Sequence, residues 1–172
     1  ELPEGLDDNG IVASLKKWTE KTHRIILDKS HELPEYEGMG TTFCGLLFLG
    51  ETVFTLNIGD SRLYRFRDGI LKQLTTDHSI QELTGDLSQE SNQIYNSLGA
   101  GESVFIDIRN ISGQIIEEDV YLICSDGLSD MLPDEKKEQI LTENPSAEAL
   151  VTAAKNAGGK DNISVILLKV IS

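Results

Sequence analysis

Cysteine is scarce in this sequence, and its placement argues against two common roles. The 172 residues include only Cys44 and Cys124, each inside an apolar run and without the CxxC spacing of a metal or redox site. We therefore interpret both as reduced, buried core residues of a protein in a reducing compartment. A disulfide between them is the less favoured alternative.

Long apolar runs are absent as well. No stretch approaches the ~20 residues that a membrane-spanning helix needs, and nothing resembles a signal peptide. The expectation is a soluble cytoplasmic protein that makes no use of a membrane. The first residue, Glu1, is not methionine, so the natural start could lie upstream.

Basic residues are few relative to acidic ones. Lys and Arg number 15 against 29 Asp and Glu, which gives a formal net charge of −14. A field of this sign repels nucleic acid and anionic lipid, so neither is an expected partner. It would also repel a phosphorylated substrate unless bound cations reversed the sign locally, so an acidic protein that handles phosphate suggests metal. The alternative is that the charge only confers solubility.

Glycine-rich phosphate loops are missing too. There is no GxGxxG or GxxxxGK[ST], so neither a dinucleotide-binding fold nor a P-loop enzyme is supported. The length favours one domain, residues 1–172, with one core and one site.

Hydrophobic periodicity predicts helices near both ends of the chain. Apolar residues recur at helical spacing over 11–29, where Asp8 or Asn9 can cap the amino end. Two further helices are expected, one from Pro133 through Leu141 and one from the cap Ser146 to the glycines 158–159.

Strand patterns occupy the middle of the chain and its end. Residues 41–74 predict an antiparallel meander, with its strongest turn signal at Asp68-Gly69. Residues 75–102 are polar, and we expect a flap-like segment that is the least ordered part of the domain, with one short helix. Regular structure is expected to resume with SVFIDIRNI (103–111), and buried strands are expected within DVYLICS (119–125) and NISVILLKVI (162–171). Strands that precede helices favour an α+β fold of antiparallel sheets over a parallel doubly wound sheet.

Three aspartates share one kind of position, at the end of an apolar strand beside glycine or a small polar residue. They are Asp60 in NIGDSR, Asp126 in CSDGLSD and Asp161 in GGKDNIS. If the strands next to Asp126 and Asp161 are antiparallel neighbours, their carboxylates emerge at one edge, where hard oxygen ligands suit Mg²⁺ or Mn²⁺. Asp-Gly and Gly-Asp are also ordinary turn pairs, so each aspartate could be a turn former instead.

A series of short motifs resembles the ordered signatures of bacterial 2C-type protein serine/threonine phosphatases. The pieces are MGTT (39–42), NIGDSRLYRFRDG (57–69), LTTDHS (74–79), SLG (97–99), CSDGLSDML (124–132) and GGKDNISVILL (158–168). Each piece alone is weak, but their order over residues 39–171 makes coincidence improbable. The resemblance implies an antiparallel β-sandwich flanked by helices, with a metal site at one edge.

The resemblance also implies the chemistry and its residues. Asp126 and Asp161 would ligate the metal centre, Asp60 would help to hold a further ion, and Gly127 and Asn162 would support them. The implied cofactors are two or three Mn²⁺ or Mg²⁺ ions, which activate a water for attack on phosphoserine or phosphothreonine. The expected partners of such a monomeric enzyme are phosphorylated proteins, including a Ser/Thr kinase and its substrates. The sequence offers no activated cysteine or histidine nucleophile, in keeping with attack by water.

Two motifs with which the family normally opens, an RxxNED-like segment and DGxGG, do not occur in residues 1–172. One hypothesis is that the chain is the larger, carboxyl-terminal part of an active phosphatase. Another is a catalytically incomplete 2C-like domain that acts as a binding or regulatory module. A third is an α+β interaction domain whose aspartates only form turns. We favour the first, because clustered acids without a cation repel one another and reduce stability.

The histidines are expected to play no catalytic part. For His78 in TTDHS we favour a hydrogen-bonded structural role, while His23 and His31 are expected to be solvated or partly packed. Ser61 and Arg62 could face substrate, but Arg62 could equally be a surface charge.

Overall fold

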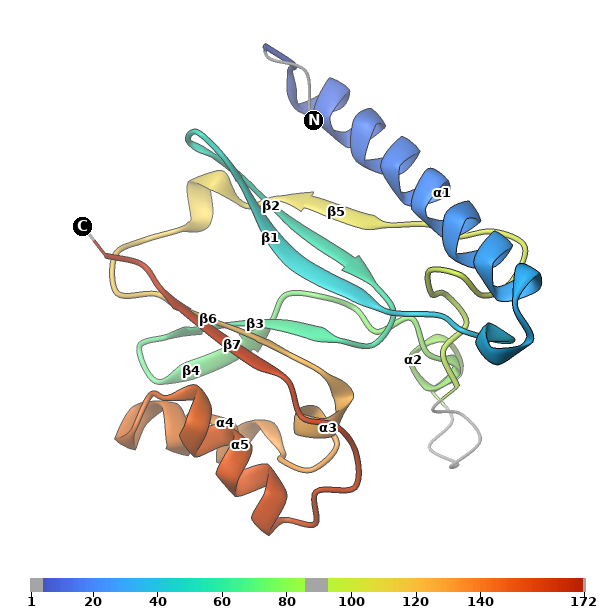
Figure 1. The fold of residues 1–172 in the computed structure, drawn as a ribbon. Coiled ribbons are helices and arrows are strands. Elements are labelled where there is room, and N and C mark those ends of the chain that lie inside the picture. The colour runs from blue at the N-terminus through green and yellow to red at the C-terminus, as the bar shows by residue number, and fades with distance from the viewer. Residues whose placement is uncertain (1–4, 86–92, 172) are drawn as a thin grey trace.

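Two antiparallel sheets lie face to face between helices in the computed structural model, which describes residues 5–85 and 93–171 (Figure 1). The first sheet has the strand order β1-β2-β5, and the second has the order β4-β3-β6-β7. The strands are β1 (Phe43–Leu49), β2 (Thr52–Ile58), β3 (Arg62–Arg67), β4 (Ile70–Gln73), β5 (Asp107–Asn110), β6 (Val120–Cys124) and β7 (Val165–Lys169). The predicted α+β sandwich is confirmed.

Helices cover the outer faces of the two sheets (Figure 1). The long helix α1 packs on the three-stranded sheet, and α4 and α5 pack on the four-stranded sheet. The helices are α1 (Asp8–Glu32), α2 (Ile80–Thr84), α3 (Asp126–Ser129), α4 (Asp134–Glu143) and α5 (Ala147–Asn156). No helix within the described residues is both long and apolar enough to cross a bilayer.

Successive side chains of the central strands point to opposite faces of their sheet, and the apolar ones form three separate layers. In β2, Val53 packs between the sheets, whereas Phe54 faces the layer under α1. In β6, Tyr121 packs between the sheets and Leu122 faces α4 and α5. Because side chains alternate between the two faces of a strand, one strand contributes to two cores.

The predicted meander over 41–74 is wrong in its middle. β1 and β2 form one hairpin and β3 and β4 another, but these hairpins belong to different sheets. The chain crosses from one sheet to the other between β2 and β3, at Gly59-Asp60. The tight turn at Asp68-Gly69 is confirmed, with φ of 52° and 79°, the positive values that such a hairpin turn requires.

Helix boundaries follow the capping signals with one correction. The cap of α1 is Asp7, whose carboxylate accepts a hydrogen bond from the Gly10 amide at 2.8 Å, and not Asp8 or Asn9. At the other end of the chain, Pro133 directly precedes α4 and the Ser146 hydroxyl caps α5, as predicted.

The strand near the carboxyl end was predicted to be buried, and this prediction is wrong. β7 is the edge strand of its sheet, and its Ile166 is 54% exposed because no further described strand covers that side. β6, by contrast, is central in the sheet, in agreement with its apolar run.

The polar segment 75–102 contains the expected short helix, α2. The part of this prediction that falls on residues 86–92 lies outside the described residues. At the described ends, His78 and Asn96 are buried, and an antiparallel bridge joins Ser79 to Ile94. The expectation that the segment is the least ordered part of the domain stays a prediction.

Both cysteines are free thiols, as predicted. Cys124 is buried, as predicted, whereas Cys44 is only half-buried, because it lies in β1 at the edge of its sheet. Burial raises the pKa of Cys44 to about 12 and that of Cys124 to about 11.

Candidate metal centre

One edge of the four-stranded sheet collects the three aspartates that the sequence singled out. In the register of the sheet, Arg62 is opposite Cys124, and Cys124 is opposite Val165. β3 and β7 therefore begin at the edge where β6 ends. Asp60 precedes β3, Asp126 follows β6 and Asp161 precedes β7. The condition on which the metal prediction depended, that β6 and β7 are antiparallel neighbours, is confirmed.

Asp60 is held at this edge by a turn that only glycine fits. Gly59 has φ of 101°, and a Cβ added there would lie 2.4 Å from Cγ2 of Thr42. The Asp60 side chain is half-buried. Its pKa is raised from 3.8 to about 6, chiefly by burial and next by the charge of Asp126.

Asp126 opens the short helix α3 at the end of β6. Its carboxylate accepts a hydrogen bond from the Gly127 amide at 2.8 Å. Four residues further on, Asp130 faces the same region, and burial together with the Asp126 charge raises its pKa. The sequence reasoning missed Asp130, although a spacing of four residues in CSDGLSD predicts a shared helix face.

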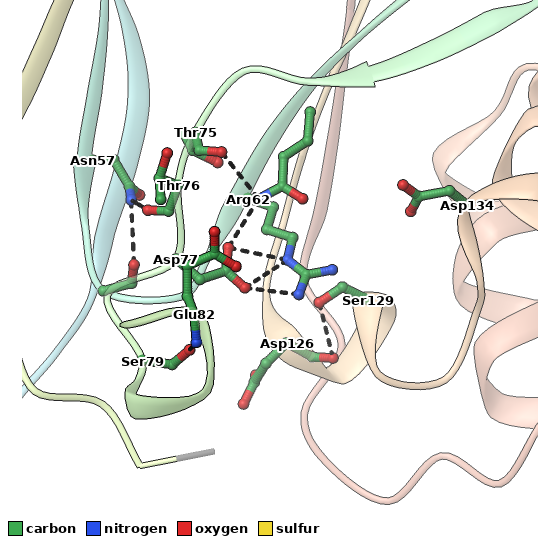
Figure 2. Close-up of polar contacts among 12 residues, drawn as sticks. Asn57, Arg62, Thr75, Thr76, Asp77, Ser79, Glu82, Asp126, Ser129 and Asp134 are labelled. Carbon is green, nitrogen blue, oxygen red and sulfur yellow. Dashed lines mark hydrogen bonds and ion pairs between the residues drawn. The ribbon is translucent and has the colours of Figure 1, made fainter. Parts of the chain in front are cut away.

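A small polar cleft of about 80 Å³ lies between these elements. Its charged lining comprises four carboxylates and one guanidinium: Asp60, Asp77, Asp126, Asp130 and Arg62. Several of these side chains are drawn in Figure 2. The excess of carboxylates gives the cleft a negative potential that favours a cation.

Arg62 is paired with one of these acids, Asp77 (Figure 2). Its Nε and Nη2 donate to the carboxylate of Asp77 at 2.9 and 2.7 Å, and its Nη1 donates to the hydroxyl of Tyr64 at 3.2 Å. Arg62 is therefore a fixed part of the cleft wall, not a free surface charge. Its partner Asp77 lies 15 positions along the chain, so no local spacing could have predicted it.

The loop that carries Asp161 packs directly against α3. A Cβ added to Gly127 would lie 2.3 Å from the carbonyl oxygen of Asn162, so only glycine allows this approach. Ser125 stabilises the contact, because its hydroxyl donates to that same carbonyl at 3.1 Å and accepts from the Ser164 amide at 3.0 Å. The predicted supports Gly127 and Asn162 thus meet through the backbone of Asn162.

Asp161 itself is exposed and does not line the cleft. One of its carboxylate oxygens accepts from the Asn162 amide at 2.6 Å. Its charge reaches the cluster, since it contributes to the raised pKa of Asp130.

The residues present fit part of a metal site. The donors are hard carboxylate oxygens, and a dication would offset the burial and the repulsion that together raise the pKa of Asp60. Across residues 5–85 and 93–171, however, no three acidic, histidine or cysteine side chains are grouped closely enough to enclose a metal ion. The carboxylates at this edge would therefore provide some of the ligands, with water among the others.

The histidines are all outside this cluster. His78 is buried and hydrogen-bonded, as predicted. His23 is only 4% exposed, contrary to the expectation of a solvated or partly packed side chain, because its Nδ1 accepts from the Gly99 amide inside the fold. His31 is exposed.

Comparisons with known proteins agree on one family. The model for protein phosphatase 2C matches residues 3–164. The serine/threonine phosphatase stp of Listeria monocytogenes serotype 4b (strain F2365) is 34% identical over 174 residues, which cover 90% of this chain and 68% of that protein.

Solved structures give the same result. Serine/threonine phosphatase Stp1 from Staphylococcus aureus has a TM-score of 0.83 at 26% identity, covering 99% of this chain and 72% of that one. The catalytic domain of the phosphatase PstP, crystallised with two manganese ions, has a TM-score of 0.76 at 31% identity, covering 99% and 74%.

Proposed function

This chain belongs to the protein phosphatase 2C family, and on that premise we propose that it hydrolyses phosphoserine and phosphothreonine in proteins with the help of divalent metal ions. The ions would be held at the acidic edge of the four-stranded sheet. The proposed cofactors are Mn²⁺ or Mg²⁺, and the relative that was crystallised with two manganese ions supports the first. The proposed partners are phosphorylated cytoplasmic proteins, including a Ser/Thr kinase and its substrates.

We further propose that residues 1–172 are the larger, carboxyl-terminal part of a single phosphatase domain and that residues 75–102 act as its flap. The described part of this segment adjoins the cleft, because Asp77, Ser79 and Gln81 contribute to its lining.

The observation that carries the proposal is the accumulation of carboxylates around Asp60. Burial and the neighbouring charges of Asp126, Asp77 and Asp130 all act to raise its pKa. The guanidinium in the cleft lining is already bound to Asp77. A bound dication would stabilise a fold that brings carboxylates together in this way.

In the proposed mechanism, Asp126 and Asp161 would hold the metal centre and Asp60 would hold a further ion. Bound Mn²⁺ or Mg²⁺ would supply Lewis acidity, which makes water a nucleophile at neutral pH and offsets the charge of the phosphoryl oxygens. Gly127 permits the two loops to meet, and the Arg62–Asp77 pair fixes the wall of the cleft between β3 and residues 75–79.

The chain's thiols are unsuited to nucleophilic attack on phosphorus. Burial raises the pKa of Cys44 to about 12 and that of Cys124 to about 11, so both are protonated at neutral pH. These pKa values are consistent with attack by water, without a phosphocysteine intermediate.

The test compares wild type with Asp126→Asn in the hydrolysis of a phosphothreonine peptide over a Mn²⁺ titration. The substitution keeps the shape of the side chain but removes a charged ligand. We expect a rate at least ~100-fold lower, a loss of roughly 3 kcal/mol of transition-state stabilisation, and chelation should abolish the wild-type activity. Asp28→Asn, at an exposed position on α1, is the matched control and should leave the rate unchanged.

Residues 1–172 should be assayed and, if the natural protein extends beyond them, the full-length form beside them. Since the described acids leave much of the coordination sphere to water, residues 1–172 alone should bind Mn²⁺ weakly and hydrolyse the peptide slowly. Equal rates for wild type and Asp126→Asn would exclude the role of Asp126. A folded full-length protein without activity at any Mn²⁺ concentration would instead favour a binding or regulatory module.

A further inference from the structure

His78 is a buried side chain that joins several parts of the structure next to the proposed metal centre. It is 2% exposed and follows Asp77, whose carboxylate binds Arg62. Both of its ring nitrogens have partners, and each partner belongs to a different part of the chain.

The contacts of the imidazole fix its tautomer. Nδ1 lies 3.0 Å from the backbone nitrogen of Gly59, which can only donate, so Nδ1 is the acceptor. Nδ1 also lies 2.7 Å from Nδ2 of Asn96. With Nδ1 unprotonated, Nε2 carries the proton and donates to the Asp107 carboxylate at 3.2 Å.

The orientation of Asn96 removes the remaining ambiguity. Its side-chain oxygen accepts from the Phe105 amide at 3.1 Å, and its Nδ2 donates to the Phe105 carbonyl at 3.0 Å. These two backbone partners determine which end of the Asn96 amide faces His78, and it is the donor end. The ring also packs against Phe105, with 4.6 Å between centroids.

The backbone of His78 reinforces the same connection. Its amide donates to the Gly59 carbonyl at 3.0 Å, so Gly59 is bound to His78 through both its N–H and its C=O. On the other side, the Tyr95 amide donates to the His78 carbonyl at 3.0 Å. The turn at Gly59 is thereby attached to the segment that returns through Tyr95 and Asn96 and, through Asp107, to β5.

We propose that His78 is a positioning residue, which fixes the Gly59 turn and thereby holds the adjacent carboxylate of Asp60 at the acidic edge. This inference rests on the proposed function, because Asp60 matters there as a metal ligand. A carboxylate that is half-buried beside Asp126 is under repulsion, and a free turn would let it move toward solvent. The positioning depends more on the hydrogen bond that Nδ1 accepts than on the one that Nε2 donates.

A matched pair of substitutions separates the two nitrogens. In His78→Asn, the side-chain oxygen can replace Nδ1 as the acceptor for the Gly59 amide, whereas the longer His78→Gln can replace Nε2 as the donor to Asp107. His31→Gln makes the same chemical change at an exposed position and serves as the control. Asp107→Ala is a further variant that alters the network from its half-exposed side and keeps the imidazole in place.

The readouts are Mn²⁺ affinity by titration calorimetry, the exchange rate of the Gly59 amide by NMR, and kcat and KM on a phosphothreonine peptide. We expect His78→Gln to weaken Mn²⁺ binding and lower kcat by at least about tenfold, with KM nearly unchanged, and to speed Gly59 exchange. His78→Asn should recover most of both losses, and Asp107→Ala should show a smaller loss than His78→Gln. His31→Gln should match wild type.

Equal losses in the two His78 variants, or wild-type Mn²⁺ affinity in a folded His78→Gln, would overturn the inference, since a role in stability alone predicts no difference between them. If wild type itself binds no Mn²⁺, the proposed function has failed, and Gly59 exchange in the metal-free variants then decides the positioning role. Faster exchange in His78→Gln but not in His78→Asn supports it, and equal exchange overturns it. If His78→Gln does not fold, Asp107→Ala takes its place, and wild-type Mn²⁺ affinity in that variant overturns the inference.

Discussion

At the scale of single residues, both burial and the neighbouring carboxylates oppose ionisation of the Asp60 side chain. Its pKa of about 6 is above its ordinary value of 3.8, because it is partly buried and faces Asp126. The folded protein therefore binds this proton more tightly than the unfolded chain does. Its contribution makes the free energy of unfolding fall as pH rises from about 4 to about 6, with no further loss above that range.

Replacing Asp60 by Asn should therefore stabilise the protein when metal is removed. In chelator at pH 7.5 we expect a gain in the free energy of unfolding of about 1–2 kcal/mol, below the ~3 kcal/mol equivalent to two pKa units, because solvent screens a half-buried group. The gain should disappear below about pH 4, where the acid is protonated in both states. Urea unfolding measures this, with Asp28→Asn as the control. A variant less stable than wild type at pH 7.5 would contradict the repulsion argument.

At the scale of elements, the proposed metal centre depends on the contact between α3 and the loop before β7. Ser125, Gly127 and Asn162 make this contact, and it fixes the distance between the parts of the chain that carry Asp126 and Asp161. Because the closest approach involves backbone atoms of Asn162, neither side can yield by rotating a side chain.

Gly127→Ala should force these two elements apart. The added Cβ would lie 2.3 Å from a carbonyl oxygen, so we expect a loss of about 1–3 kcal/mol in the free energy of unfolding, as for other overpacked sites. Mn²⁺ affinity should fall as well. Gly113→Ala is the control, since a Cβ there meets nothing within 4 Å. Equal unfolding midpoints for the two variants in urea would show that the contact is not tight in solution.

Local signals predicted the elements better than their assembly. The apolar run of β6, the Asp68-Gly69 turn and the Ser146 cap depend on neighbouring residues, and all three are found where the sequence indicated. The division of 41–74 between two sheets depends instead on which strand β3 pairs with. That partner is β6, which lies far along the chain, so a local pattern could not have predicted it.

The candidate site shows the same limit. Asp60 and Asp126 were predicted from their place at strand ends, and the structure brings both to one cleft. Asp77 was missed because it enters the cleft lining as the ion-pair partner of Arg62, a contact that only the fold creates. Asp161 is placed at the predicted edge, but its role as a ligand stays a prediction.

At the scale of the whole molecule, the sandwich gathers carboxylates at one edge of a chain with a formal net charge of −14. Such a surface repels a phosphorylated substrate. Cations bound at this edge would reverse the sign where the phosphate must approach, which links the composition of the chain to its proposed activity.

Anomalous X-ray diffraction from crystals soaked in Mn²⁺ tests this claim most directly, because it locates the ions without depending on activity. We predict a manganese peak within roughly 2.0–2.4 Å of an Asp126 carboxylate oxygen and a further peak at Asp60. The carboxylates of Asp126 and Asp161 should lie on the order of 4–7 Å apart, so that both serve one centre. Absence of any peak beside Asp60, Asp126 and Asp161 at millimolar Mn²⁺, or a separation of Asp126 and Asp161 beyond about 12 Å, would contradict it.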